Sequence, residues 1–304
     1  MDRLTGRRGF LETVGGLGTA WAASPIAVEG AEAPPEVRTA REARLAMRRG
    51  EWRGPTVNKL PGCVQCNLVV LSKVYAYDFL HNCQRNPKPC PLMEVTDPGS
   101  AESKLTAPGA DLRTDLPRYA AYRDGVQGED LTDIRGLWRE DSVAFLIGSS
   151  LTFDHALERA GVPRDPLRPS APADGPAALT RQVWVLETKL PTAPAGIFRG
   201  PLVVTMRWMT PAQAVIATQL TSRFPFNHGA PVHIGDPEAI GADLVHPIYG
   251  EPVREIPRGI LPVFWACGVT PQRTALLARP ELMITHSPGH GFITDLLADQ
   301  VCLP

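Results

Sequence analysis

Residues 67–95 read NLVVLSKVYAYDFLHNCQRNPKPCPLMEV and place a strand, a helix, a stiff loop and a second strand in immediate succession. The apolar run Asn67–Leu71 predicts a short buried strand, and Leu92–Val95 predicts another. Between them, Tyr75–His81 predicts a helix that leads into the loop Cys83–Pro91. A helix that connects two strands is typical of an α/β protein.

The alternation of strands and helices continues along the chain. Strands are predicted at residues 142–147, 183–186, 202–206, 263–266 and 283–285, and helices at residues 35–50, 153–160, 211–220 and 271–278. A stretch rich in proline and alanine, residues 163–178, has no periodicity and predicts a flexible excursion. The fold class that follows from this order is α/β.

The loop Cys83–Pro91 is polar and stiff. Its three prolines fix φ and bias the preceding residues toward extended geometry, so its polar side chains point in set directions. Arg85, Asn86 and Lys88 are therefore candidates for binding a small anionic substrate. The alternative is a structural turn whose Arg85 and Lys88 face solvent.

Composition limits the classes of function. The 304 residues are 43% hydrophobic, enough for one large core or two smaller domains. The formal net charge is -1, and no basic block indicates a nucleic-acid partner. There is no Walker loop, dinucleotide-binding glycine pattern or G-x-S-x-G elbow, so NAD, ATP and serine-hydrolase chemistry lose support and no cofactor is expected.

The N-terminus differs from the rest. Arg7–Leu11 looks like a twin-arginine export signal, and Ala31–Ala33 offers a cleavage site between small residues. Residues 1–34 are therefore set apart as a signal or, alternatively, as a disordered or amphipathic extension. A working signal would export the chain to the periplasm, and otherwise it stays in the cytoplasm. No later run is long and apolar enough to span a membrane.

Four cysteines have spacings that invite three interpretations. Cys63 and Cys66 form a C-x-x-C pair, and Cys83 and Cys90 follow. Together they suggest a zinc site of four thiolates, a redox pair or unlinked thiols. The wide, proline-containing spacing of Cys83 and Cys90 is unlike a zinc knuckle, so unlinked thiols are preferred.

Several polar segments follow predicted strands, where ligands bind in open α/β sheets. Arg113 and Arg118 are candidates to clamp a carboxylate, with Asp115 orienting one of them, although a surface network of ion pairs explains them equally well. Ser149 follows another strand and either donates to an anion or caps the next helix.

The remaining candidates are histidines and the residues beside them. His228 or His233 is a candidate general base, with Asp236 fixing the tautomer. His286 and His290 are reserve acids; their His-x-x-x-His spacing suggests a helical metal pair only superficially, because a proline and a glycine lie between them.

One junction of strand and helix adds two candidates. Cys267 lies where a nucleophile or an anion-binding helix N-terminus would lie, and Thr270, just before that helix, is a substrate-binding candidate. A small buried residue at a tight junction explains Cys267 equally well.

Many short motifs of this chain resemble, in the same order, a family of bacterial hydro-lyases, and a related domain forms the N-terminal part of mitochondrial D-glutamate cyclase. The matching segments are Gly54–Thr56, Val64–Gln65, Asn67–Leu68, Asp78–Leu80, Cys83–Pro91, Arg113–Asp115, Pro117–Tyr119, Leu137–Arg139, Gly200–Val204, Arg223–Pro225, His228–Pro237, Trp265–Gln272, Thr285–His286 and Pro288–His290. The resemblance covers residues 35 to 298.

This resemblance implies a mixed sheet with flanking helices and a smaller inserted α+β domain. We expect residues 35–130 and 226–304 to form the main domain and residues 131–225 the smaller one. It also implies a lyase that eliminates water from a small carboxylate or amino-acid-like substrate. A non-catalytic carboxylate-binding protein and a metal-dependent hydrolase are the alternatives, and a homo-oligomer stays open.

The chain departs from the family at several places, and the proline- and alanine-rich stretch, residues 163–178, looks like an insertion. Cys63 and Cys66 stand where relatives carry Tyr and Ala, Ser149 replaces a usual Cys, and Gln182–Lys189 replaces a segment richer in Asn, Tyr and Arg. These departures bear on the substrate more than on the fold.

Overall fold

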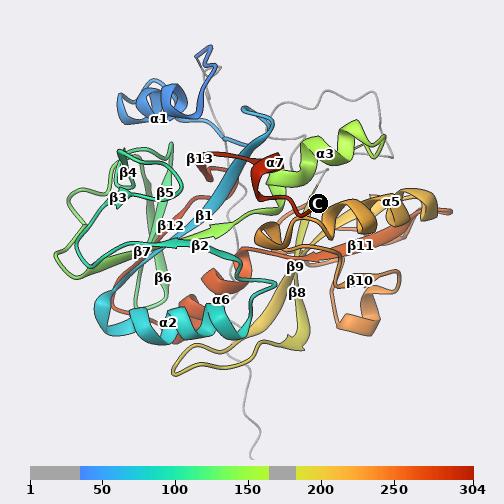
Figure 1. The fold of residues 1–304 in the computed structure, drawn as a ribbon. Helices are drawn as coiled ribbons and strands as arrows, with labels where there is room; N and C mark the ends of the chain where they lie inside the picture. Colours follow the sequence, from blue (N-terminus) through green and yellow to red (C-terminus); the bar gives the residue numbers. More distant parts are fainter. Residues whose placement is uncertain (1–34, 164–182) are drawn as a thin grey trace, which may run out of the picture.

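The computed structural model describes residues 35–163 and 183–304 and confirms the α/β class. Two sheets lie next to each other with helices packed around them (Figure 1). The predicted export signal, residues 1–34, and most of the predicted excursion, residues 163–178, lie outside the described residues.

The larger sheet is built around one long buried strand, β1 (Cys63–Ser72). Its strand order is β2-β7-β1-β12-β5-β6, with β13 also paired to β1. The other bounds are β2 (Leu92–Val95), β5 (Tyr119–Arg123), β6 (Val126–Leu131), β7 (Ser142–Gly148), β12 (Met283–His286) and β13 (Phe292–Leu297). All pairings between these strands are antiparallel.

Strands β12 and β13 pair with the same edge of β1, one after the other. Thr285 faces Val69, and Phe292 faces Cys66. Strand β12 ends at His286, and residues 287–291 form a turn before β13 begins, opposite Asn67 and Leu68. We call His286 together with these residues the 286–291 turn.

The smaller sheet has the order β10-β11-β9-β8 and is also antiparallel. Its bounds are β8 (Trp184–Pro191), β9 (Pro201–Met209), β10 (His233–Ile234) and β11 (Leu261–Ala266), and a short pair, β3 (Glu102–Ser103) and β4 (Ala110–Asp111), lies apart. Strand β7 belongs to the larger sheet, whereas β10 and β11 belong to the smaller one. The division into residues 35–130 with 226–304 and residues 131–225 stays a prediction.

Helix α2 (Lys73–Arg85) covers one face of the larger sheet. Its N-cap Ser72 accepts a hydrogen bond from the Val74 amide, and Phe79 packs edge-on against Phe145 of β7. The helix is longer than predicted because no proline interrupts it before Pro87. Cys83 and Arg85 are therefore helical, and the stiff loop begins at Asn86.

Helix α6 (Val269–Ala278) lies between the two sheets and contacts β9 in one and β12 in the other (Figure 1). The remaining helices are α1 (Ala40–Arg48), α3 (Asp154–Arg159), α5 (Pro211–Thr221), α7 (Ala298–Val301) and the 3-10 turns η1 (Ser150–Phe153), η2 (Pro225–Asn227) and η3 (Pro237–Ile240). No helix within residues 35–163 and 183–304 is long and apolar enough to cross a membrane.

The cysteines are unlinked, as preferred from the sequence. Cys63 packs beside α1, while Cys66 lies in the apolar cluster that contains Leu68. Cys83 and Cys90 lie in a different cluster, which also contains Phe79 of α2. The four thiols therefore do not converge on one point.

Gly148, the last residue of β7, lies against the backbone of η2. A Cβ there would lie 1.8 Å from the Phe226 carbonyl oxygen, which is backbone and must shift. We expect Gly148→Ala to lower the free energy of unfolding by about 1–3 kcal/mol or more in urea titrations. Gly136→Ala is the matched control, because a Cβ there meets nothing within 4 Å. Equal stability of the two variants would contradict this close approach.

Candidate functional site

Six polar side chains from separate segments gather where β1, the 286–291 turn and the start of α6 meet. They come from β1, from the residue after β7, from the residue after η2, from α6 and from the turn itself. We call them the polar seam: Asn67, Ser149, His228, Gln272, His286 and His290.

His286 is a buried, neutral hydrogen-bond donor. Its Nδ1 accepts from the Leu68 amide at 3.2 Å and faces Nε2 of Gln272 at 3.1 Å. Because a backbone N–H can only donate, Nδ1 carries no proton and the proton resides on Nε2. Burial lowers the pKa of His286 to about 4, so the ring is uncharged at neutral pH.

His290 has the opposite tautomer. Its Nδ1 lies 2.8 Å from the Pro288 carbonyl oxygen, which can only accept, so Nδ1 carries the proton and Nε2 keeps a lone pair. Burial is the main cause that lowers the pKa of His290 to about 4, and the Arg118 charge contributes to the same shift. A charge on His290 would also disfavour protonation of His286, which contributes to the lowered pKa of His286.

Arg118 and Ser287 complete this turn. The Arg118 carbonyl accepts from the Ser287 amide at 3.0 Å, which ties the turn to the start of β5. The Arg118 guanidinium lies 3.8 Å from an oxygen of Asp130, too far for a hydrogen bond. The Ser287 hydroxyl is buried and has no hydrogen-bond partner within the described chain.

Thr56 and Gln65 hold the turn in place, and their motifs entered the sequence analysis only through the family resemblance. The Thr56 amide donates to the Gly289 carbonyl at 2.9 Å, and its hydroxyl donates to the Gly291 carbonyl at 3.0 Å. Gln65 Nε2 donates to the Thr56 carbonyl at 3.2 Å. Gly289 has φ 78°, a conformation that glycine adopts without strain.

Asn67 connects β1 with the end of β7 and the start of α6. Its Nδ2 donates to the Gly148 carbonyl at 3.3 Å. A Cβ on Gly268 would lie 1.9 Å from the same Nδ2, so the first residue before α6 must be glycine for this contact. Sequence reasoning missed Asn67 as a candidate because it lies within an apolar run.

His228 joins the proline-rich loop to the end of β7. Its Nδ1 lies 3.0 Å from the Lys88 carbonyl oxygen, and its neighbour in the chain, Asn227, lies against Gly148 at the end of β7. Burial lowers the pKa of His228 to about 4 and lowers the pKa of Lys88 as well. The Lys88 ammonium lies 3.7 Å from the position of a Cβ on Gly229 and is therefore beside the seam.

Asn86 and Arg85, the other two candidates near this loop, form hydrogen bonds with the connection between β8 and β9. Asn86 Nδ2 donates to the Ala193 carbonyl and its Oδ1 accepts from the Ala193 amide, both at 2.8 Å. Arg85 donates to the Pro194 carbonyl. These contacts fix the connection rather than direct either side chain at the seam.

Arg113 and Asp115 bond to other partners. Arg113 forms a two-point ion pair with Asp111, at 2.8 and 2.9 Å. Asp115 is buried and pairs with Arg48 through both oxygens at 2.7 Å, instead of orienting Arg113 or Arg118.

His233 and Asp236 lie near each other on the smaller sheet. Nε2 of His233 is 2.6 Å from the backbone carbonyl of Asp236, while the Asp236 carboxylate caps η3. The contact is therefore not the carboxylate–imidazole pair that the sequence suggested.

Cys267, Thr270 and Ser149 lie at the seam or beside it and make structural contacts. Thr270 Oγ1 exchanges two hydrogen bonds with the Val203 backbone, each at 3.0 Å. Ser149 Oγ caps η1 by accepting from the Leu151 amide. Burial raises the pKa of Cys267 to about 11, so the thiol stays protonated at neutral pH and is a poor nucleophile.

Metal donors do not cluster in the part of the chain that the structure describes. No group of three or more His, Cys, Asp or Glu side chains is arranged to hold a metal ion there. The 286–291 turn is not helical, as expected from its proline and glycine.

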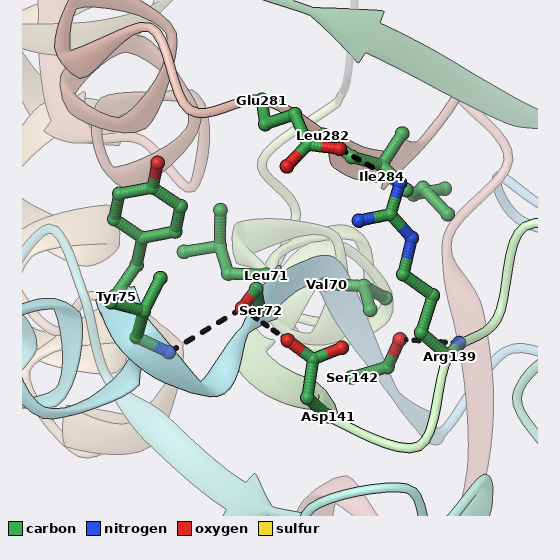
Figure 2. A pocket seen from close by; sticks show the side chains of 11 residues that line it. Val70, Leu71, Ser72, Tyr75, Arg139, Asp141, Ser142, Glu281, Leu282 and Ile284 are labelled. Carbon is green, nitrogen blue, oxygen red and sulfur yellow. Dashed lines mark hydrogen bonds and ion pairs between the residues drawn. The ribbon is translucent and has the colours of Figure 1, made fainter.

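A surface hollow lies at the other end of β1 (Figure 2). Ser72 donates to Asp141 at 2.5 Å there, and Arg139 pairs with Glu281 at 2.9 Å. These side chains satisfy each other, and none of them belongs to the polar seam.

The three seam histidines make the fold sensitive to acid. In the folded chain their pKa is about 4, against an ordinary value of 6.5, so the unfolded chain binds more protons below pH 6.5. The free energy of unfolding is therefore highest above about pH 6.5. It decreases as the pH falls toward 4, by roughly 3 kcal/mol for each histidine. We expect the urea midpoint to fall through this window. A midpoint that is the same at pH 7 and pH 5 would contradict the neutral rings.

Comparison of the sequence with known proteins identifies the family of the chain. A family model described as D-glutamate cyclase matches residues 143–295, from β7 to β13. A protein of Bacillus licheniformis named "Putative hydro-lyase" is 50% identical over 85% of this chain and 95% of its own length. Proteins of the same name from Geobacillus kaustophilus and Stutzerimonas stutzeri are 50% and 52% identical, over 86% and 85% of this chain and 96% and 94% of their own lengths.

These relatives match 259 to 264 residues of this chain, and half or more of the matched residues are identical, which shows a shared family. The resemblance expected from the short motifs is confirmed, as is the expected class of carbon–oxygen lyase. The chain belongs to the family of hydro-lyases that carries the D-glutamate cyclase domain.

Proposed function

We propose that the chain removes water from a small carboxylated substrate at the 286–291 turn. The reaction is either elimination from a hydroxy acid or cyclisation of an amino acid such as D-glutamate. The observation that carries the proposal is the pair His286 and His290, two neutral rings of opposite tautomer beside the Arg118 cation. Both histidines lie within the segment that matches the D-glutamate cyclase model.

An elimination of water needs a base for the proton, a donor for the leaving oxygen and a cation for the carboxylate. His290 Nε2 takes the proton from carbon as the carbon–oxygen bond breaks. The same proton then passes to the leaving hydroxyl, which departs as water. His286 donates a hydrogen bond from Nε2 to that oxygen and does not change its own protonation state.

Cyclisation uses the same groups. The substrate ammonium gives one proton to His290, and the free amine then attacks its own carboxylate carbon. His290 passes that proton to one carboxylate oxygen, takes a second proton from the nitrogen and passes it to the same oxygen, which leaves as water. Arg118 binds the other carboxylate, and Lys88 supplies a second cation at the seam. One geometry therefore supports both reactions, and the substrate decides between them.

His290→Gln tests the assigned base. Glutamine keeps a polar side chain but has no basic lone pair, so we expect kcat to fall by roughly 10²–10⁴-fold with a smaller change in KM. The assay offers D-glutamate and a panel of hydroxy acids and detects dehydrated product by mass spectrometry. His233→Gln is the matched control, because it changes a histidine outside the seam.

Full activity in His290→Gln would contradict the assignment. A raised Tm with carboxylates but no product from any member of the panel would indicate a binding protein instead. Neither outcome depends on folding, provided that the two histidine variants have the circular dichroism and Tm of the parent chain.

A further inference from the structure

Arg207 is a buried cation in the smaller sheet that has no role in the proton transfers described above. It lies on β9 and is only 4% exposed. Its Nη1 pairs with Asp154, the first residue of α3, and its guanidinium lies 5.2 Å from the ring centre of Phe153 and 5.6 Å from that of Trp265. The pair and the two rings fix the orientation of the guanidinium.

The other edge of this guanidinium is unpaired. Its Nε and Nη2 donate to no acceptor within residues 35–163 and 183–304. These two nitrogens lie on one side of the group and form a planar fork. A buried donor without a partner is costly, so two on one side chain indicate a ligand that supplies two acceptors.

Elsewhere in the chain the same fork binds carboxylates. Nε and Nη2 of Arg48 reach the two oxygens of Asp115, each at 2.7 Å. The corresponding atoms of Arg113 reach those of Asp111 at 2.8 and 2.9 Å. Arg207 presents this arrangement without a carboxylate of the chain to fill it.

Two further unpaired polar atoms belong to the same region. The Thr205 hydroxyl lies on the same face of β9, two residues before Arg207, and has no partner in the described chain. Asn227 Oδ1 is also unpaired, while its Nδ2 donates at 3.0 Å to Thr152, the residue before Phe153. Cys267 lies near enough to sense the Arg207 charge and is itself uncharged, so it does not compete for the fork.

We propose that Arg207 binds a carboxylate of a small organic acid through Nε and Nη2, with Asp154 holding the guanidinium in place. This rests on the proposed function in one respect: the acid is taken to be the substrate of the lyase. The chain supports that link, because Cys267 leads directly to Gly268, which packs on Asn67 of the polar seam.

The test measures Tm in sodium acetate and in sodium formate against sodium chloride at equal ionic strength. We expect the carboxylates to raise the Tm of the parent chain by about 2–4 °C relative to chloride. Arg207→Lys keeps a charge for Asp154 but loses the fork, so the increment should disappear. Arg49→Lys is the matched control, because Arg49 uses the same fork on the surface, toward Glu51.

If Arg207→Lys does not fold, the double variant Arg207→Met with Asp154→Asn removes both buried charges and should also lack the increment. The site would be overturned if acetate and formate raised the Tm of Arg207→Lys or of the double variant as much as that of the parent chain. It would also be overturned if they did not raise the Tm of the parent chain.

The Tm test of the Arg207 site and the activity test of the proposed lyase reaction can fail independently. An increment in the parent chain without product from any tested acid would contradict the lyase reaction and support the Arg207 site. Turnover with unchanged KM in Arg207→Lys, together with no increment in the parent chain, would overturn the site and leave the reaction standing.

Discussion

The backbone N–H of Leu68 has no strand partner, and the arrangement of the polar seam depends on how that donor is satisfied. On either side of it, β1 pairs with β12 and with β13, but at Leu68 the opposite chain leaves the sheet. A buried N–H must find an acceptor, and His286 Nδ1 provides it at 3.2 Å. The imidazole thus replaces a ladder carbonyl, and this one bond decides which nitrogen of His286 carries the proton.

The strands and helices follow from local patterns, whereas the site does not. Apolar runs such as Asn67–Leu71 become buried strands because both faces of the sheet are covered. The rule that ligands gather at the carboxyl ends of strands applies to parallel sheets, and in this antiparallel sheet neighbouring strands end at opposite edges. The seam instead forms where the edge of β1 is unpaired between β12 and β13. The periodicity of apolar residues in the sequence does not reveal such a break.

Charged residues illustrate the same limit. Arg113 and Asp115 form a conspicuous motif, yet each is neutralised by a near neighbour in space, Asp111 and Arg48. Arg207 attracts no attention within the apolar run of β9, yet it is a buried cation with two unpaired donors. Sequence shows which charges exist, but which of them are already paired depends on contacts such as Arg48 with Asp115, which lie far apart in the chain.

The seam is organised around weak bases in a positive environment. A histidine with pKa near 4 is always ready to accept a proton at neutral pH, but it accepts only from an acidic partner. The proton to be removed must therefore be made acidic by the site itself. In the reaction that we propose, Arg118 and Lys88 stabilise negative charge on the bound acid. Burial is the main cause of the low pKa values of His290 and His228, and the charges of Arg118 and Lys88 lower them as well. On this proposal the same cations weaken the base and activate the substrate, so the rate depends more on the charge that develops on the substrate than on the strength of His290.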